Sequence, residues 1–232
     1  MAVRPVFLVS TEDNFSVRAE DVEFKWFPGM SLAQRQHSAR SLAESVREKH
    51  PGKKILEVSR MSDNALGVKL SAFNLVYPAG NETAGRPVEC VFQSSKVFRD
   101  GGPYRDLIAK SPKDAKTDPR LKASGPLLEF NIEGETWPNQ PLTAFYDWIY
   151  LLALRAAPNL ADDVSNYDVF TDIAFNPQKS FSCQAQTVAL FVSLRKKGIV
   201  DQVLRSRETF LSYLNTDKDR VAGNATQMKL GL

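Results

Sequence analysis

The sequence predicts an α+β protein in which helices outnumber strands. Three observations favour this class. Strand-like segments gather near the start of the chain, the second half is mostly helical in pattern, and 43% hydrophobic with 25% charged residues is typical of a globular protein. A chain of 232 residues can also bury a sizeable core without staples. We expect one domain over residues 1–214 and a polar, frayed tail over residues 215–232.

Short apolar runs bounded by turn residues predict strands in the first part of the chain. They cover residues 3–10, 22–27, 53–59 and 67–77. Between the second and third run, Ser31 can cap a helix that continues to about Lys49 and ends before Pro51. Residues 78–87 form a polar connection that is rich in turn residues.

Helices are predicted for most of the remaining chain. One covers residues 88–98 and stops at the two glycines before Pro103, and Ser111 caps another that has a proline at its first position. Further helices are expected over residues 104–110, 144–157, 158–167, 180–198 and 199–214, with an extended segment over residues 170–175. The helix over residues 144–157 is apolar enough to be buried on most sides. Its aromatic residues are therefore expected in the core, namely Phe145, Tyr146, Trp148 and Tyr150.

Composition and missing motifs exclude several classes of function. The net charge of +3 permits contact with phosphates but is lower than a dedicated nucleic-acid-binding protein usually carries. The glycine-rich nucleotide-binding loops, the HExxH motif and the GxSxG motif are all missing. Both histidines, His37 and His50, fall on the polar first helix, and the two cysteines, Cys90 and Cys183, are far apart. We expect no metal and no cofactor, so if the protein is an enzyme, its chemistry must depend on carboxylates, lysines and groups of the bound substrate.

Nothing in the sequence predicts contact with a membrane. The start, MAVRPVFLVS, lacks the apolar region and the cleavage site of a signal peptide. No apolar run approaches the roughly 20 residues that span a bilayer. A cytoplasmic protein in a reducing compartment is therefore expected.

One short stretch, VECVFQSSKVF at residues 88–98, carries the candidate chemistry. Read as a helix, it places Glu89, Gln93 and Lys96 at positions i, i+4 and i+7, on one face beside an apolar stripe. Two interpretations are open. The three side chains form a solvated helix face, or they line a pocket and act on a substrate.

A resemblance to the NADAR superfamily bears on this choice. GRPVECVFQSSKVF is similar to the family motif that contains EHYFQAQKF, with Glu89, Phe92, Gln93, Lys96 and Phe98 in place. SAFNL resembles the family's SNF segment, and SPKDAK resembles the helix that follows the motif. Nearly the whole chain is similar to the NADAR proteins associated with DarT-type toxins, through the segments RPVF, FQSSKVFRDGGPYRDL, TAFYDWIYLLAL, FTDIAFNPQKS and CQA.

The resemblance implies an activity and site residues. The toxins are DNA ADP-ribosyltransferases, and their NADAR partners are antitoxins that remove ADP-ribose from guanine bases in DNA. Other members cleave N-glycosidic bonds in riboflavin-pathway intermediates and carry a glycine-rich loop near the C-terminus. This chain has FTDIAFNPQKSFSCQA instead, which favours the toxin-associated branch. The family carboxylate corresponds to Glu89, Cys90-Val91 replace the family's His-Tyr, and Asp172 is the counterpart of a late aspartate.

Two routes can break the bond between guanine's exocyclic amine and the ribose. In one, a carboxylate activates water while an acid protonates the leaving nitrogen. In the other, the ribose opens to an imine and a neutral lysine exchanges into it. Glu89 and Lys96 suit both routes, with Glu89 moving protons and Lys96 serving as the attacking amine or as an electrostatic clamp.

Other residues are candidates for contact with ADP-ribose. Gln93 can hydrogen-bond ribose hydroxyls, Phe73 can stack, and Asn74 can make a polar contact. Gly102 allows the backbone to approach a pyrophosphate, unless the glycines serve only to stop a helix. Tyr104 can cover the adenine or the ribose. Asp147 interrupts an apolar helix and is either a site acid or a buried ion-pair partner, and Asp172 is either a site residue or a turn residue.

Three functions follow, in order of preference. The first is a DNA guanine de-ADP-ribosylase that acts as an antitoxin, with ADP-ribosylated DNA as substrate, ADP-ribose as product and a DNA ADP-ribosyltransferase toxin as possible partner. The second is an N-glycosidase for small ribosylamines. The third is a non-catalytic module that binds ADP-ribose.

Overall fold

The computed structural model describes residues 1–12, 16–81, 83–178 and 182–216. The fold is α+β, as predicted, and helices take up more of the described residues than strands do. The chain forms two compact units. The first unit combines Met1–Ser71 with Pro158–Leu232, and the second is Ala72–Ala157.

A four-stranded sheet is the centre of the first unit. Its strands lie in the order β2 (Val17–Phe24), β1 (Ala2–Val9), β9 (Val169–Thr171) and β3 (Ile55–Glu57). β1 is antiparallel to β2 and β9, and β9 is parallel to β3. Neighbouring residues of a strand point to opposite faces. Because Val6 and Phe7 are both buried, both faces of the sheet are covered.

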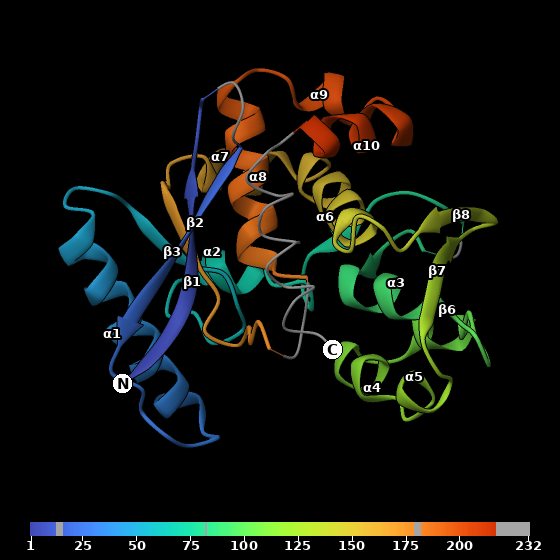
Figure 1. The fold of residues 1–232 in the computed structure, drawn as a ribbon, viewed down its shortest axis with the longest axis horizontal. Coiled ribbons are helices and arrows are strands. Elements are labelled where there is room, and N and C mark those ends of the chain that lie inside the picture. The colour runs from blue at the N-terminus through green and yellow to red at the C-terminus, as the bar shows by residue number, and fades with distance from the viewer. Residues whose placement is uncertain (13–15, 82, 179–181, 217–232) are drawn as a thin grey trace. The chain divides into compact units, whose positions relative to one another are not determined.

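Two long helices cover this sheet, one on each face (Figure 1). α1 (Leu32–Lys49) packs Leu42 and Val46 against Val6. Ser31 caps α1 as predicted, since its hydroxyl oxygen accepts the backbone N–H of Gln34. α8 (Gln184–Lys196) lies on the other face. The remaining helices of the unit are α2 (Ala65–Lys69), α7 (Pro158–Val164), α9 (Val200–Val203) and α10 (Arg207–Thr216).

The second unit surrounds a short buried helix, α3 (Val88–Ser94), which contacts η1, α4 and α6. The helices of this unit are η1 (Arg105–Ala109), α4 (Pro112–Thr117), α5 (Arg120–Ala123) and α6 (Ala144–Arg155). Its strands form a pair, β4 (Val76–Tyr77) with β5 (Arg86–Pro87), and a three-stranded sheet, β6 (Lys96–Phe98), β7 (Leu127–Ile132) and β8 (Glu135–Pro138).

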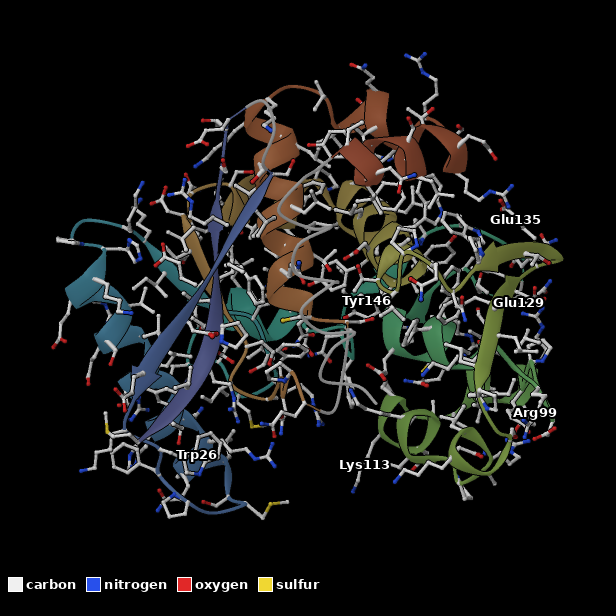
Figure 2. The ribbon with its side chains drawn as sticks, viewed as in Figure 1. Trp26, Arg99, Lys113, Glu129, Glu135 and Tyr146 are labelled. Atoms are coloured by element: carbon white, nitrogen blue, oxygen red, sulfur yellow. The ribbon has the colours of Figure 1, made fainter. Side chains whose placement is uncertain are left out.

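Aromatic rings form the core between α3, α6 and the three-stranded sheet. Phe92 of α3 packs against Phe130, Phe145 and Tyr146, with ring centroids 5.1–6.3 Å apart. Phe145, Tyr146 and Tyr150 are buried, as predicted, and Trp148 is partly buried beside Trp137. Figure 2 shows Tyr146 within the fold, whereas Arg99, Lys113 and Glu135 project from the outside of this unit.

Several predicted elements differ in extent from those of the structure, and three differ most. Residues 67–77, predicted as a strand, hold the end of α2, a turn and only the two strand residues of β4. The predicted helix over residues 88–98 ends at Ser94, and residues 96–98 form a strand that pairs with β7. Residues 199–214 are two helices rather than one. The hairpin β7-β8 was not predicted at all.

The predicted boundary at residue 214 falls inside α10. Residues 217–232 of the predicted tail lie outside the described residues. Within the described part of the chain, no helix combines the length and the apolar character that crossing a membrane requires. Cys90 and Cys183 are both buried free thiols.

Candidate active site

The first turn of α3 fixes Glu89 in the interior of the second unit. The backbone N–H groups of Val88 and Glu89 have no partners within the helix, and they donate to the carbonyls of Leu75 and Ala72, each at 2.9 Å. This ties the start of the helix to the segment that carries Phe73. Glu89 is only 4% exposed. A buried carboxylate is rare unless partners compensate for its lost hydration.

Both oxygens of Glu89 have such a partner. Oε1 accepts a hydrogen bond from Nε2 of Gln93 at 2.8 Å, one turn along α3. Oε2 lies 3.5 Å from Nζ of Lys116, near the end of α4. The same Nζ is 5.5 Å from the centroid of the Phe73 ring. The carboxylate is thereby held between an amide and an ammonium.

The side-chain carbonyl oxygen of Gln93 is left without a hydrogen-bond partner among the described residues. A carboxylate can only accept, so the amide must turn Nε2 toward Glu89 and its carbonyl away from it. Gln93 is 5% exposed, and its Oε1 has no hydrogen-bond partner among the described residues. An unpaired buried acceptor costs about 1–3 kcal/mol. Such an atom can accept a hydrogen bond from a donor group of a ligand or from a water molecule.

Lys96 is the first residue of β6, not a third position on a helix face. Its Nζ lies 4.5 Å from the centroid of the Phe92 ring, over the aromatic core. Burial lowers its pKa from 10.5 to about 8, the Glu89 carboxylate acts in the opposite direction, and the Lys116 ammonium lowers the pKa further. Among the described residues, no carboxylate oxygen lies within 4.0 Å of Lys96 Nζ. This amine therefore loses its proton far more readily than an exposed lysine.

The structure places Phe73, Asn74 and Gly102 in the same unit as Glu89. Phe73 is partly buried beneath Lys116, and Asn74 is exposed. Both lie in a turn rather than in the predicted strand. Gly102 has a φ of +85°, and a Cβ there would lie 2.5 Å from the carbonyl oxygen of Lys96. The glycine is thus required where the backbone passes close to the strand that carries Lys96.

The remaining predicted residues have different surroundings. Tyr104 is engaged within its unit, because the Arg120 guanidinium lies 4.5 Å over its ring and its hydroxyl bonds to Ser124. Asp147 is buried in α6. Asp172 belongs to the first unit, where its Oδ1 accepts the N–H groups of Ala174 and Phe175 at 3.0 and 3.2 Å. These contacts favour the interpretation of Asp172 as a turn residue.

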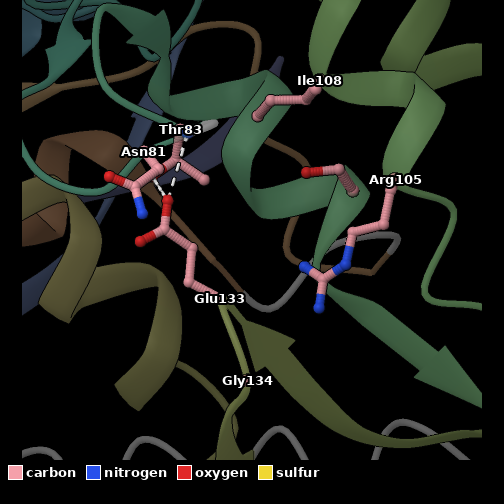
Figure 3. A pocket seen from close by; sticks show the side chains of 7 residues that line it. Asn81, Thr83, Arg105, Ile108, Glu133 and Gly134 are labelled. Atoms are coloured by element: carbon pink, nitrogen blue, oxygen red, sulfur yellow. Dashed lines mark hydrogen bonds between the residues drawn. The ribbon is translucent and has the colours of Figure 1, made fainter.

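A pocket of about 360 Å³ also lies in the second unit (Figure 3). Its lining residues are Asn81, Thr83, Ser94, Arg105, Ile108, Glu133 and Gly134, none of which was predicted as a site residue. Figure 3 shows Glu133 and Arg105 on two sides of it. Glu133 accepts from the hydroxyl of Thr83 at 2.8 Å, and Arg105 donates to the carbonyl of Asn131, also at 2.8 Å. These charged groups already serve to hold the loops and the hairpin together.

Lys116 is the residue of this site that the sequence reasoning missed. The signal was present, because Lys116 closes the SPKDAK segment and stands one turn after Pro112. Ser111 caps that helix as predicted. Cys90, which stands where the family has histidine, is buried, and burial raises the pKa of its thiol to about 11. It is therefore not a nucleophile near neutral pH.

The site thus consists of a buried carboxylate, an amide with a free acceptor, an amine that readily loses its proton, and a second amine. Among the described residues, no three His, Cys, Asp or Glu side chains are grouped so that they could hold a metal. A buried carboxylate next to an amine that readily loses its proton is an arrangement that can accept and donate protons.

Comparison with known protein families identifies the family of this chain. A family model described as the DarT1-associated NADAR antitoxin matches residues 2–224, and the chain belongs to this NADAR-DarT1 family. No curated protein matches the chain. The match covers both units of the fold and agrees with the resemblance found in the motifs.

Proposed function

We propose that this protein hydrolyses the bond between ADP-ribose and the exocyclic amine of guanine in DNA, and that it thereby reverses the action of a DNA ADP-ribosyltransferase toxin. One observation carries the proposal. Glu89, the carboxylate that the family resemblance marks, is buried with both oxygens paired, and it stands near Lys96, whose pKa is lowered to about 8. A solvated helix face would show neither feature.

The lowered pKa of Lys96 supports the covalent route. In the first step the proton of the glycosidic nitrogen passes to the ribose ring oxygen, the ring opens, and the bond from C1″ to nitrogen becomes an imine. The neutral amine of Lys96 adds to C1″, and its two protons pass to the guanine nitrogen, which leaves as the free exocyclic amine. C1″ is then bound to Nζ as an imine.

Water completes the reaction. It adds to C1″, the C1″–Nζ bond breaks, and the two protons of water return to the lysine nitrogen. The freed aldehyde closes to the ring form of ADP-ribose, so the sum is one water consumed for one bond broken. Glu89 is placed to carry protons in these steps. The free acceptor of Gln93 can take a hydrogen bond from a ribose hydroxyl, which is a donor.

The test uses a DNA oligonucleotide that contains one ADP-ribosylated guanine. Purified wild type is expected to release ADP-ribose and restore guanine. Glu89→Gln, which keeps the shape of the side chain, is expected to be slower by about 10²–10⁴-fold. Lys113→Ala, an exposed lysine on α4, serves as the control and is expected to match wild type. Borohydride added during turnover should fix ADP-ribose on Lys96, as read by peptide mass spectrometry.

Two outcomes would contradict the proposal. Tight binding of the modified oligonucleotide without release would indicate a module that only binds ADP-ribose. Neither binding nor release, together with turnover of free pyrimidine ribosylamines, would indicate the small-molecule glycosidase. A wild type that turns over without any borohydride-trapped adduct would leave the hydrolase intact and remove the covalent route.

A further inference from the structure

The two partners of the ion pair between Lys116 and Glu89 differ strongly in solvent exposure. The Glu89 side chain is 5% exposed, whereas the Lys116 side chain is 56% exposed. Lys116 keeps much of its hydration, so it gives up little to form the pair, whereas Glu89 is buried and would have one partner fewer without it. The pair therefore matters mainly for the carboxylate on which the site depends.

The pair determines whether an oxygen of Glu89 is available to Lys96. Glu89 has two oxygens, and Gln93 holds Oε1 while Lys116 stands at Oε2. The amine of Lys96 lies over the ring of Phe92, a residue of α3, and Lys96 pairs with Phe130 of β7. Its immediate neighbours are therefore aromatic rings rather than carboxylates. The charged groups that act on it are Glu89 and Lys116. Without Lys116, Oε2 would be free to pair with the ammonium form of Lys96.

We propose that Lys116 is a positioning residue, whose ammonium occupies the second oxygen of Glu89 so that Lys96 stays unpaired and able to act as a neutral amine. This proposal rests on the proposed function in assigning the amine a reaction. It also gives the two lysines different tasks, because Lys116 is solvated and stands at Glu89, whereas Lys96 is buried and loses its proton more readily. Two nearby amines in one site are a known means of keeping one of them neutral.

Lys116→Ala, Lys116→Arg and the control Lys113→Ala test this assignment. Lys116→Ala removes a like charge from Lys96 and frees Oε2, so the acid limb of kcat/KM should move to higher pH by about 0.5–1 unit. Its rate should fall about three- to tenfold at pH 7 and approach wild type above pH 9.5. Lys116→Arg keeps the cation and should keep the wild-type profile. Thermal unfolding should be nearly unchanged in Lys113→Ala and Lys116→Arg, whereas Lys116→Ala should unfold at a somewhat lower temperature because the buried Glu89 has one partner fewer.

A second measurement does not depend on turnover. An NMR titration of lysine side chains, with the Lys96 signal assigned through Lys96→Met, reports the pKa of Lys96 directly. It should rise in Lys116→Ala and stay in place in Lys116→Arg and Lys113→Ala. If the protein fails to act on modified DNA but this rise is seen, the pairing stands and the proposed function falls.

Other results would overturn the role of Lys116. A loss of activity that is equal at every pH, with an unmoved Lys96 signal, would show that Lys116 acts on the substrate or on the fold. An increase in KM alone would show that it binds the diphosphate of ADP-ribose instead.

Discussion

At the residue scale, the orientation of one amide defines what the site can accept. The side-chain amide of Gln93 donates its N–H to Glu89, so its carbonyl oxygen is left to accept a hydrogen bond from another donor. Ribose hydroxyls and guanine ring N–H groups are donors, whereas phosphate oxygens are not. The buried end of the site is therefore suited to a sugar or a base, and the proposed substrate would place its diphosphate elsewhere.

Lys96 should cost the folded protein stability near neutral pH. Its pKa is lowered from 10.5 to about 8 in the folded state, so below pH 8 folding must bury a charged amine. Lys96→Met should raise the free energy of unfolding by about 1–3 kcal/mol at pH 7. Between pH 8 and 10.5 the lysine is protonated in the unfolded chain but neutral in the folded one, so the stability of wild type rises with pH over this range. The advantage of Lys96→Met over wild type should therefore shrink as the pH increases from 8 to 10.5.

Urea unfolding at pH 7, 8, 9 and 10 measures this effect. Lys113→Met is the control, because its exposed side chain should give no pH-dependent gain. A Lys96→Met variant that is less stable than wild type at pH 7 would contradict the assignment. A stable but inactive variant would fit a residue that is retained for its chemistry.

At the element scale, the turn from α3 into β6 brings Lys96 to the site. Ser94 and Ser95 donate their hydroxyls to the carbonyl of Val91 at 3.1 and 2.7 Å, which closes the last turn of the helix. The backbone after them pairs with β7, about 30 residues later in the chain. Gly102 then allows the chain to fold back against the carbonyl of Lys96.

Gly102→Ala should therefore disturb both stability and activity. The added Cβ meets a backbone oxygen at 2.5 Å and also strains a positive φ, so unfolding should become easier by about 2–4 kcal/mol. Gly85→Ala is a matched control, since Gly85 has a φ of +75° but nothing within 4 Å of its Cβ position. It should cost about 1 kcal/mol and leave activity unchanged. Equal losses in the two variants, by thermal unfolding, would contradict the close approach.

The same elements show how far the sequence could predict the site. Ser31 and Ser111 were correctly placed as caps, because capping depends on neighbouring residues alone. Glu89 and Gln93 lie one turn apart on α3, as the helical spacing predicted, whereas the predicted helical position of Lys96 is wrong because Lys96 begins β6. The motif resemblance, which does not depend on this spacing, includes all three residues. The end of α3 depends on pairing with β7, a contact that no local pattern reports. Lys116 was missed for a similar reason, because only the fold brings α4 to Glu89.

At the scale of the whole molecule, the family model spans both units, although the described contacts of Glu89 and Lys96 all lie in the second. Asp172, in the first unit, corresponds to a late aspartate in the motif resemblance, yet here it caps a turn. The family match therefore includes residues of the first unit that make no described contact with Glu89 or Lys96.

The small net charge of +3 predicts how the whole protein should respond to salt. If DNA is the substrate, a few phosphates must be contacted, and each releases counterions. Two such contacts would weaken binding about tenfold between 50 and 200 mM salt, so KM for the modified oligonucleotide should rise by that factor while kcat stays constant. ADP-ribosylated guanosine, which lacks the DNA backbone, is the control and should show almost no salt effect. Steady-state kinetics on both substrates decides the point. Equal and small salt effects on both would show that the protein recognises the modified nucleoside alone and that DNA only carries it.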